Sequence, residues 1–275
     1  MDYSFLSGHK EQHNGASYVF PGNPRTYRMS ERLNLVLNRF YRAYADAFPN
    51  ALSPRICVIV EARNGASGYW TAAQPGTGPV FVIELDPTID GNEEIFAHEL
   101  SHPIIRLLGV PTGQSIGSID SRIGDEFTST SHHPFVFDFL DQVGYADEQR
   151  VGYTKSALEE LDKLAHADFA SPTYTAPPGQ TWLALWYFNF YLLDRQNYET
   201  IYSIQKQKAP SVAHMMEVVR ESWMVATRNK GVIKGNDASR CVRSFQSNLR
   251  NRLDLAERVS LQSFTDWRAW LFQQT

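Results

Sequence analysis

The spacing of apolar residues predicts one helix and then three short strands in the first third of the chain. Apolar side chains recur every three or four positions across residues 30–48, which is the period of a helix with one buried face, and Ser30 suits its N-cap. Residues 55–62 form an almost continuous β-branched run, which favours a strand buried on both faces. Residues 69–72 and 80–85 are two further apolar runs of strand length.

A polar arm and a second helix are expected on either side of these elements. Residues 1–28 are polar and rich in Gly, Asn, Ser and Pro, which predicts an irregular arm. After the strands, helical spacing predicts a helix from about 92 to 108, with Asp90 as N-cap and Gly109 at its C-terminal end. Pro103 falls inside this helix, and because proline has no amide hydrogen we expect a kink there.

The rest of the chain is expected to be mainly helical. Helical patterns lie at residues 135–143, 155–167, 180–197, 199–207, 211–228, 237–259 and 264–273. We therefore expect an α+β protein, in which a small mixed sheet packs on the helix at 92–108 and a mainly α-helical half follows. Residues 1–150 would form the core domain with its N-terminal arm, and residues 151–275 a helical subdomain that completes a cleft.

Composition and charge narrow the class of protein. The 275 residues are 43% hydrophobic and 20% charged with a net charge of −4, which gives no overall attraction to nucleic acid. Residues 220–258 carry nine basic and four acidic side chains, which indicates either a solvated helix surface or a face for an acidic partner. Cys57 and Cys241 imply no disulfide framework, and no secretory signal or membrane-spanning stretch is visible, so we expect a cytoplasmic protein.

The chemistry of the chain is concentrated in the run His98-Glu99-Leu100-Ser101-His102. On a helix the two histidines, four positions apart, lie one above the other, so both imidazoles can bind one zinc ion. The glutamate after the first histidine can reach a water molecule on that metal as a general base. The alternative is a surface helix with two ordinary histidines, but the position of the motif in mid-helix favours the metal site.

This motif, with the helix and strands before it, resembles that of the zincin metallopeptidases. The resemblance implies a zincin-like core, a zinc ion held by His98 and His102, and hydrolysis of a peptide or protein substrate with Glu99 as general base. It also implies that a strand beside the motif helix is an edge strand that pairs with an extended substrate. The best candidate for that strand is 80–85, or else 69–72.

The third zinc ligand has to come from a later segment. In the metzincin pattern a glycine and a third histidine follow closely, but Ile105 and Leu108 stand at those positions, which excludes that subgroup. The gluzincin pattern has a glutamate on a second helix, and Glu126 is the candidate here. Ser129 matches the loosely similar E-x-x-S arrangement of that pattern, but the aspartate expected next is Thr130 in this chain.

Neighbours of Glu126 compete with it as the third ligand. Asp125 would point about 100° away from Glu126 on a helix, so both cannot face the metal equally. His132 or His133 could ligate zinc, cap the next helix or contact the oxygen of the transition state. The candidates for a group that stabilises the oxyanion are Tyr153, Tyr174, Tyr187 and His214.

The sequence therefore predicts a gluzincin-like zinc metallopeptidase that acts on a peptide or protein. Two other functions stay open on the same residues. One is a catalytically inactive zincin-like binding module, and the other is a regulatory protease with a single protein target. Stoichiometric zinc, followed by cleavage of a peptide library with and without chelator, separates the peptidase from the binding module.

Overall fold

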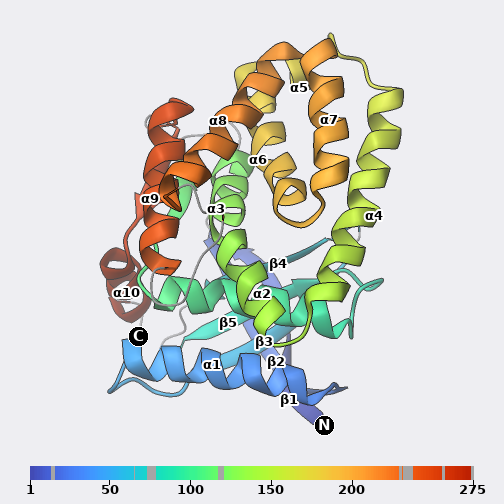
Figure 1. Ribbon diagram of the computed structural model, residues 1–275. Helices are drawn as coiled ribbons and strands as arrows, with labels where there is room; N and C mark the ends of the chain where they lie inside the picture. The colour runs from blue at the N-terminus through green and yellow to red at the C-terminus, as the bar shows by residue number, and fades with distance from the viewer. Residues whose placement is uncertain are drawn as a thin grey trace. The chain divides into compact units, whose positions relative to one another are not determined.

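The computed structural model describes the chain outside a few short stretches. The residues left out are 14–15, 65, 73–78, 117–120, 229–230, 232–237, 256–257 and 274–275. The chain forms two compact units, one of Met1–Gly109 with Ser263–Thr275 and the other of Val110–Gln262. The expected α+β class is confirmed by a five-stranded sheet and a mostly helical C-terminal half (Figure 1). The domain boundary expected near residue 150 stays a prediction.

The sheet of the first unit contains both parallel and antiparallel pairs. Its strands are β1 (Asp2–His13), β2 (Ala16–Arg28), β3 (Arg55–Val60), β4 (Ser67–Ala72) and β5 (Val80–Leu85). Their order is β2-β1-β3-β5-β4, in which β1 and β5 run parallel to β3 while β2 and β4 are antiparallel to their neighbours. The three strands expected from the apolar runs are confirmed as β3, β4 and β5.

The N-terminal segment is a long β-hairpin, so the expectation of an irregular arm is wrong. β1 and β2 pair along almost their whole length, and Phe5 and Val19 are buried. The prolines that favoured a loop, Pro21 and Pro24, lie opposite a shift in register, where proline is tolerated because the ladder is already interrupted. The pairing partner, rather than the composition of the segment, made it a hairpin.

Gly8 allows this hairpin to approach β3 closely. β1 pairs with β3 at Leu6 and Ser7, which lie beside Cys57 and Val58. A Cβ atom on Gly8 would overlap the sulfur of Cys57, so a larger residue could not occupy this position unless neighbouring atoms shifted. The core on this side of the sheet is formed by Val19, Cys57, Ile59, Val80 and Val82.

Three helices belong to the first unit: α1 (Glu31–Ala47), α2 (Glu93–Leu107) and α10 (Phe264–Gln273). Ser30 caps α1 as expected, since its side chain accepts a hydrogen bond from the amide of Arg32. On β5, Phe81 contacts aromatic rings from two of these helices. Its partners are Phe40 at 4.8 Å, Tyr44 at 6.1 Å and Trp267 at 6.5 Å between ring centroids. This aromatic layer buries one face of the sheet.

The N-cap of α2 is Asn92, so the prediction of Asp90 is wrong. The Asn92 side chain accepts hydrogen bonds from the amides of Glu94 and Ile95, at 3.0 and 3.3 Å. Asp90 instead accepts a hydrogen bond from the Tyr27 hydroxyl at 3.0 Å. It also forms an ion pair with Arg25, which lies on β2 as Tyr27 does. A tertiary contact of Asp90 therefore replaces the cap that its local sequence favoured.

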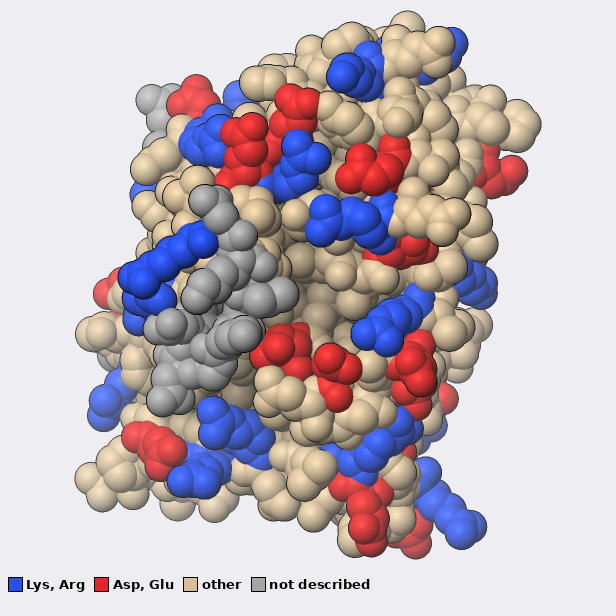
Figure 2. Space-filling view, viewed as in Figure 1, with Lys and Arg blue, Asp and Glu red and all other residues tan. Residues whose placement is uncertain are grey.

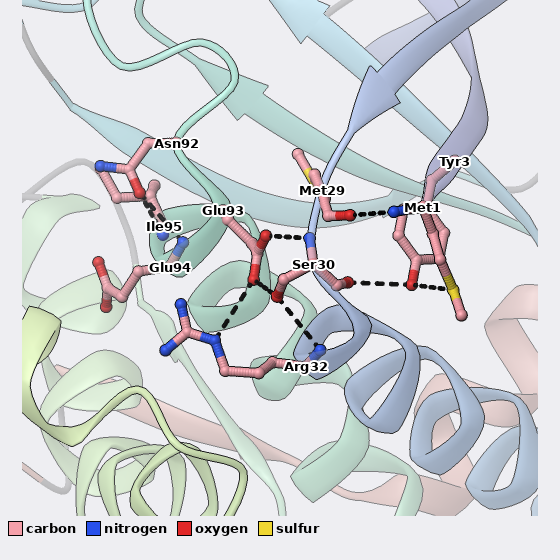
Figure 3. Close-up of polar contacts among 9 residues, drawn as sticks. All are labelled: Met1, Tyr3, Met29, Ser30, Arg32, Asn92, Glu93, Glu94 and Ile95. Carbon is pink, nitrogen blue, oxygen red and sulfur yellow. Dashed lines mark hydrogen bonds and ion pairs between the residues drawn. The ribbon is translucent and has the colours of Figure 1, made fainter.

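The first turn of α2 is tied to the start of α1. Glu93 accepts hydrogen bonds from both the amide and the hydroxyl of Ser30, the amide at 2.5 Å (Figure 3). Arg32 lies on the same carboxylate, with its Nε at 3.7 Å from Oε1. Because one carboxylate lies at the N-termini of both helices, it also interacts favourably with both helix dipoles. This contact orients α2 within the first unit.

A buried carboxylate lies on the opposite face of the sheet from Phe81. Glu84 of β5 is only 3% exposed. It accepts a hydrogen bond from Trp70 Nε1 at 2.7 Å and from Lys10 Nζ at 3.0 Å, and it pairs with Arg63. Lys10 comes from the hairpin and Trp70 from β4, so this ion cluster links three parts of the sheet.

The second unit is mostly helical. Its elements are β6 (Thr112–Ser115), α3 (Ser121–Gln142), α4 (Ala146–Ala165), α5 (Pro172–Thr175), α6 (Pro177–Leu193), α7 (Arg195–Lys208), α8 (Pro210–Ala226), α9 (Ala238–Arg252) and β7 (Val259–Gln262). The expected C-terminal helices are confirmed, although α4 begins earlier than predicted and α9 ends earlier. The strand pair β6–β7 was not expected. No helix in the described ranges is both long and apolar enough to cross a membrane.

Helix α3 runs unbroken through Pro134, so the prediction of a separate helix beginning near residue 135 is wrong. Proline removes one helical hydrogen bond, which costs on the order of 3 kcal/mol in an exposed helix. Here every residue from 130 to 137 is buried, and α3 packs against α6 along this stretch. The packing energy keeps the helix continuous in spite of the missing bond.

The basic stretch of residues 220–258 is partly neutralised in its described part. Arg252 donates a hydrogen bond to Glu221, at 2.5 Å, and Arg250 donates to the carbonyl of Val259 at 2.9 Å. On the face drawn in Figure 2, basic and acidic side chains are intermixed. The choice between a solvated helix surface and a face for an acidic partner stays open.

Candidate metal centre

The two histidines of the motif converge on one point beside α2. The Nε2 atoms of His98 and His102 are 3.3 Å apart, and both side chains are partly exposed. Two zinc–nitrogen bonds of about 2.0–2.1 Å at a tetrahedral angle place the nitrogens about 3.3–3.4 Å apart. The pair therefore fits two positions of a tetrahedral metal site, as the four-residue spacing predicted.

Glu99 lies on the adjacent face of α2, and its carboxylate is held by β4. Its side chain is 6% exposed, and its Oε1 accepts a hydrogen bond from Ser67 Oγ at 2.6 Å. Burial raises the pKa of Glu99 to about 7, against the lowering effects of the Ser67 hydrogen bond and the nearby Arg63 charge. A carboxyl group with a pKa near neutrality can both accept and return a proton at neutral pH.

The motif lies in the middle of a well-defined helix. α2 continues through Pro103 to Leu107, and Gly109 follows with a φ of +87°. That left-handed conformation is the one that favours glycine after a helix end, and it confirms the expected stop. The kink expected at Pro103 stays a prediction. The continuous helix keeps the two imidazoles one turn apart.

β4 lies beside α2 and forms one edge of the sheet. β5 pairs with β3 on one side and β4 on the other, so the first choice of 80–85 as the edge strand is wrong. The alternative, 69–72, lies within β4 and is confirmed as an edge strand. β4 contacts α2, and its first residue is Ser67, the hydrogen-bond partner of Glu99.

The sequence-predicted third ligand, Glu126, lies in the second unit on α3. Its side chain is partly buried, and its Oε1 accepts a hydrogen bond from Thr130 Oγ1 at 3.2 Å. Burial raises the pKa of Glu126 to about 7, and the neighbouring Asp125 carboxylate adds to this increase. Asp125 itself is exposed on another side of the helix. Glu126 as a ligand stays a prediction.

His133 lies two turns further along the same face of α3 as Glu126. Its ring is buried, with Nδ1 at 2.7 Å from Asn189 Oδ1 and Nε2 at 3.0 Å from Ser129 Oγ. Burial lowers its pKa to about 4, so the ring is neutral at physiological pH, which is the form that binds metals. His132 faces another direction and has its Nε2 at 3.3 Å from the carbonyl of Pro111.

The four candidates for an oxyanion-stabilising group have different surroundings. Tyr187 is fully buried and donates a hydrogen bond to Glu160 at 2.9 Å, so its hydroxyl is engaged inside the second unit. Tyr153 lies edge-on to His133, with the ring centroids 6.4 Å apart. The Tyr174 ring lies tilted against Phe169, with the ring centroids 4.7 Å apart, and His214 is exposed. The choice among them stays open.

Two residues that contact the site were missed in the sequence. Ser67 is one of many serines, and nothing in its local sequence marks it. Asn189 did carry a signal, because it is a single amide inside the aromatic run Trp186 to Tyr191. A polar side chain in an otherwise apolar helix is usually there to make a specific hydrogen bond.

Comparison of the chain with family models, with curated proteins and with solved structures finds no match. The resemblance to the zincins therefore stays an expectation from the motif and from the helix and strands before it.

Proposed function

We propose that this protein is a zinc-dependent metallohydrolase that cleaves peptide bonds. His98 and His102 would supply two ligands, and Glu99 would act as the general base. The observation that carries the proposal is the 3.3 Å separation of the two Nε2 atoms, with the Glu99 carboxylate on the adjacent face of the same helix turn.

We propose that the third ligand comes from α3 and is His133. Together with His98 and His102 it would give three imidazole donors, which would leave the fourth position of a tetrahedral zinc ion for water. Its ring is neutral, and its Nδ1 is engaged by Asn189, which suits Nε2 for metal binding. Glu126, on the same helix face, is the alternative that the gluzincin pattern predicts.

In the proposed reaction, Glu99, Ser67 and the edge of β4 would each have a separate role. The metal, when bound, lowers the pKa of a water molecule and polarises the substrate carbonyl. Glu99 would accept the proton of the attacking water and return it to the departing amine. Ser67 would hold the Glu99 carboxylate in place through its hydrogen bond. The free edge of β4, next to α2, offers backbone donors and acceptors to an extended peptide.

The decisive experiment combines metal analysis with one conservative variant. The purified protein is expected to contain one zinc per chain and to cleave members of a random peptide library, and a chelator should stop the cleavage. Glu99→Gln should keep the zinc and slow cleavage by about 10²–10⁴-fold, which is the usual contribution of a general base. Glu94→Gln, which removes a nearby carboxylate of the same helix, is the control and should remain active.

The burial of Glu99 also supports a second function, a binding module that holds a partner without cutting it. A base that is 6% exposed and bonded to Ser67 is less accessible than a carboxylate lining an open cleft. Full zinc occupancy, together with no cleavage of any peptide by wild type, would favour this function over the peptidase. Peptides retained equally by wild type and Glu99→Gln would then identify the bound sequence.

A further inference from the structure

Asn189 contacts His133 in the interior of the second unit through only one end of its side-chain amide. Asn189 lies on α6, has no exposed surface, and is surrounded in sequence by aromatic residues. Its Oδ1 lies 2.7 Å from His133 Nδ1, while its Nδ2 has no hydrogen-bond partner among the residues that the structure describes. A buried amide that satisfies only one of its two ends is unfavourable for stability, so the satisfied end has a purpose that apolar packing cannot serve.

The chemistry of this contact determines which nitrogen of His133 carries the hydrogen. A neutral imidazole has one N–H and one lone pair, and an amide oxygen only accepts hydrogen bonds. With Oδ1 facing Nδ1, the hydrogen is on Nδ1 and the lone pair is on Nε2. Ser129 Oγ, at 3.0 Å from Nε2, then donates its hydroxyl hydrogen to that lone pair in the metal-free chain. Because a hydroxyl hydrogen can rotate away, this bond leaves the lone pair available to a metal ion.

The ring is also held in orientation by its neighbours. Phe137 stacks on His133, with ring centroids 4.8 Å apart and planes at 24°. Tyr153 meets the ring edge-on. In metal sites, a second residue commonly holds the histidine in one tautomer and one orientation through a hydrogen bond to its other ring nitrogen. The surroundings of His133 have this arrangement.

We propose that Asn189 is a positioning residue, which fixes His133 as the Nδ1–H tautomer and thereby directs its Nε2 lone pair to a metal ion. The inference rests on the proposed function for its metal, but its hydrogen-bond part concerns the second unit alone. If the amide of Asn189 were reversed, the hydrogen would be on Nε2 and His133 could not serve as a ligand in that form.

The tautomer is measured directly by ¹⁵N nuclear magnetic resonance of the full-length, metal-free protein labelled at histidine. The wild type is expected to show the hydrogen of His133 on Nδ1, which is the less common form of free imidazole. Asn189→Leu removes the acceptor and should shift His133 towards the Nε2–H form, whereas Asn189→Asp keeps an acceptor and should retain Nδ1–H. A wild-type signal with the hydrogen on Nε2 overturns the inference and needs no variant.

Metal affinity provides the second readout, from competition between the protein and a chromogenic chelator for zinc. Asn189→Leu is expected to weaken zinc binding by about 10–100-fold, as substitutions of residues that orient a ligand do. Asn189→Asp should bind zinc at least as tightly as wild type. Gln205→Leu is the matched control, because Gln205 is an equally buried amide that donates to Tyr187.

The outcomes separate this inference from the proposed function. Equal zinc affinities for Asn189→Leu, Gln205→Leu and wild type overturn the positioning role, even if zinc is bound through other residues. A wild type that binds no zinc overturns the proposed function and with it the directing of Nε2 to a metal, while an Nδ1–H signal would still establish the hydrogen bond.

Discussion

Ser67 Oγ donates a hydrogen bond of 2.6 Å to Oε1 of Glu99, and so joins the first residue of the edge strand to the proposed base. The contact opposes the effect of burial on the Glu99 pKa. It also fixes the direction of the carboxylate, because Glu99 has several rotatable bonds and α2 alone would not orient it.

Removal of the Ser67 hydroxyl should slow hydrolysis without loss of the metal. We expect Ser67→Ala to reduce kcat by about tenfold or more, in the range seen when a residue that orients a catalytic group is replaced. Zinc content, measured by elemental analysis, should stay at the wild-type level. Ser67→Thr keeps the hydroxyl and serves as the control. A wild-type kcat for Ser67→Ala would show that Glu99 is oriented by other contacts.

The two candidates for the third ligand can be distinguished by their variants. His133→Ala should weaken zinc binding by more than the 10–100-fold that is typical for a residue outside the coordination shell. Glu126→Gln, which keeps the shape of the side chain and its contact with Thr130, should weaken it by less than about tenfold. Competition with a chelator measures both. The reverse order would assign the ligand to Glu126, as the gluzincin pattern predicts.

The close approach of Gly8 to Cys57 predicts a coupled effect on stability. Gly8→Ala should lower the free energy of unfolding by about 1–3 kcal/mol, because the new methyl group overlaps the Cys57 sulfur. Cys57→Ala removes that sulfur and should cost less in the presence of Gly8→Ala than alone. Urea denaturation of the two single variants and the double variant gives the coupling energy. Strict additivity would contradict the proposed overlap.

The buried carboxylate of Glu84 should be important for the stability of the first unit. Glu84→Gln removes the buried carboxylate that Lys10 and Arg63 share and leaves them only the more exposed Glu61. We therefore expect a loss of about 1.5–3 kcal/mol in the free energy of unfolding, the range for hydrogen bonds to charged groups. The control is Glu159→Gln, which breaks an exposed pair with Lys155 on α4 and should change stability by less than about 0.5 kcal/mol. Equal melting temperatures for both variants would contradict the importance of the buried cluster.

Several features of the fold could not be predicted because they depend on distant partners. Asp90 has the local sequence of an N-cap, yet its side chain bonds to Tyr27 of the hairpin, and Asn92 caps α2 instead. Pro134 has the local effect of a helix breaker, yet packing against α6 carries α3 through it. In both cases a tertiary contact outweighs a local preference of a few kcal/mol or less.

The part of the candidate site formed by His98, Glu99 and His102 could be predicted because it lies within about one helix turn. The spacing of His98 and His102 brings their nitrogens together on any regular helix, and Glu99 follows on the adjacent face without help from the rest of the chain. The same is true of the α1 cap at Ser30 and of the buried strand β3, which depend on short-range patterns.

The sequence by itself determined the motif helix, the apolar strands and the helical character of the second half, because residues a few positions apart specify those features. Only the tertiary structure decided that the N-terminal segment pairs as a hairpin, that β4 rather than β5 forms the edge, and that Ser67 and Asn189 hold Glu99 and His133. Ser67 and Glu99 are 32 positions apart in the sequence, and His133 and Asn189 are 56 positions apart. Local propensities carry no information on such pairings, which form only when the burial of apolar surface brings distant segments together.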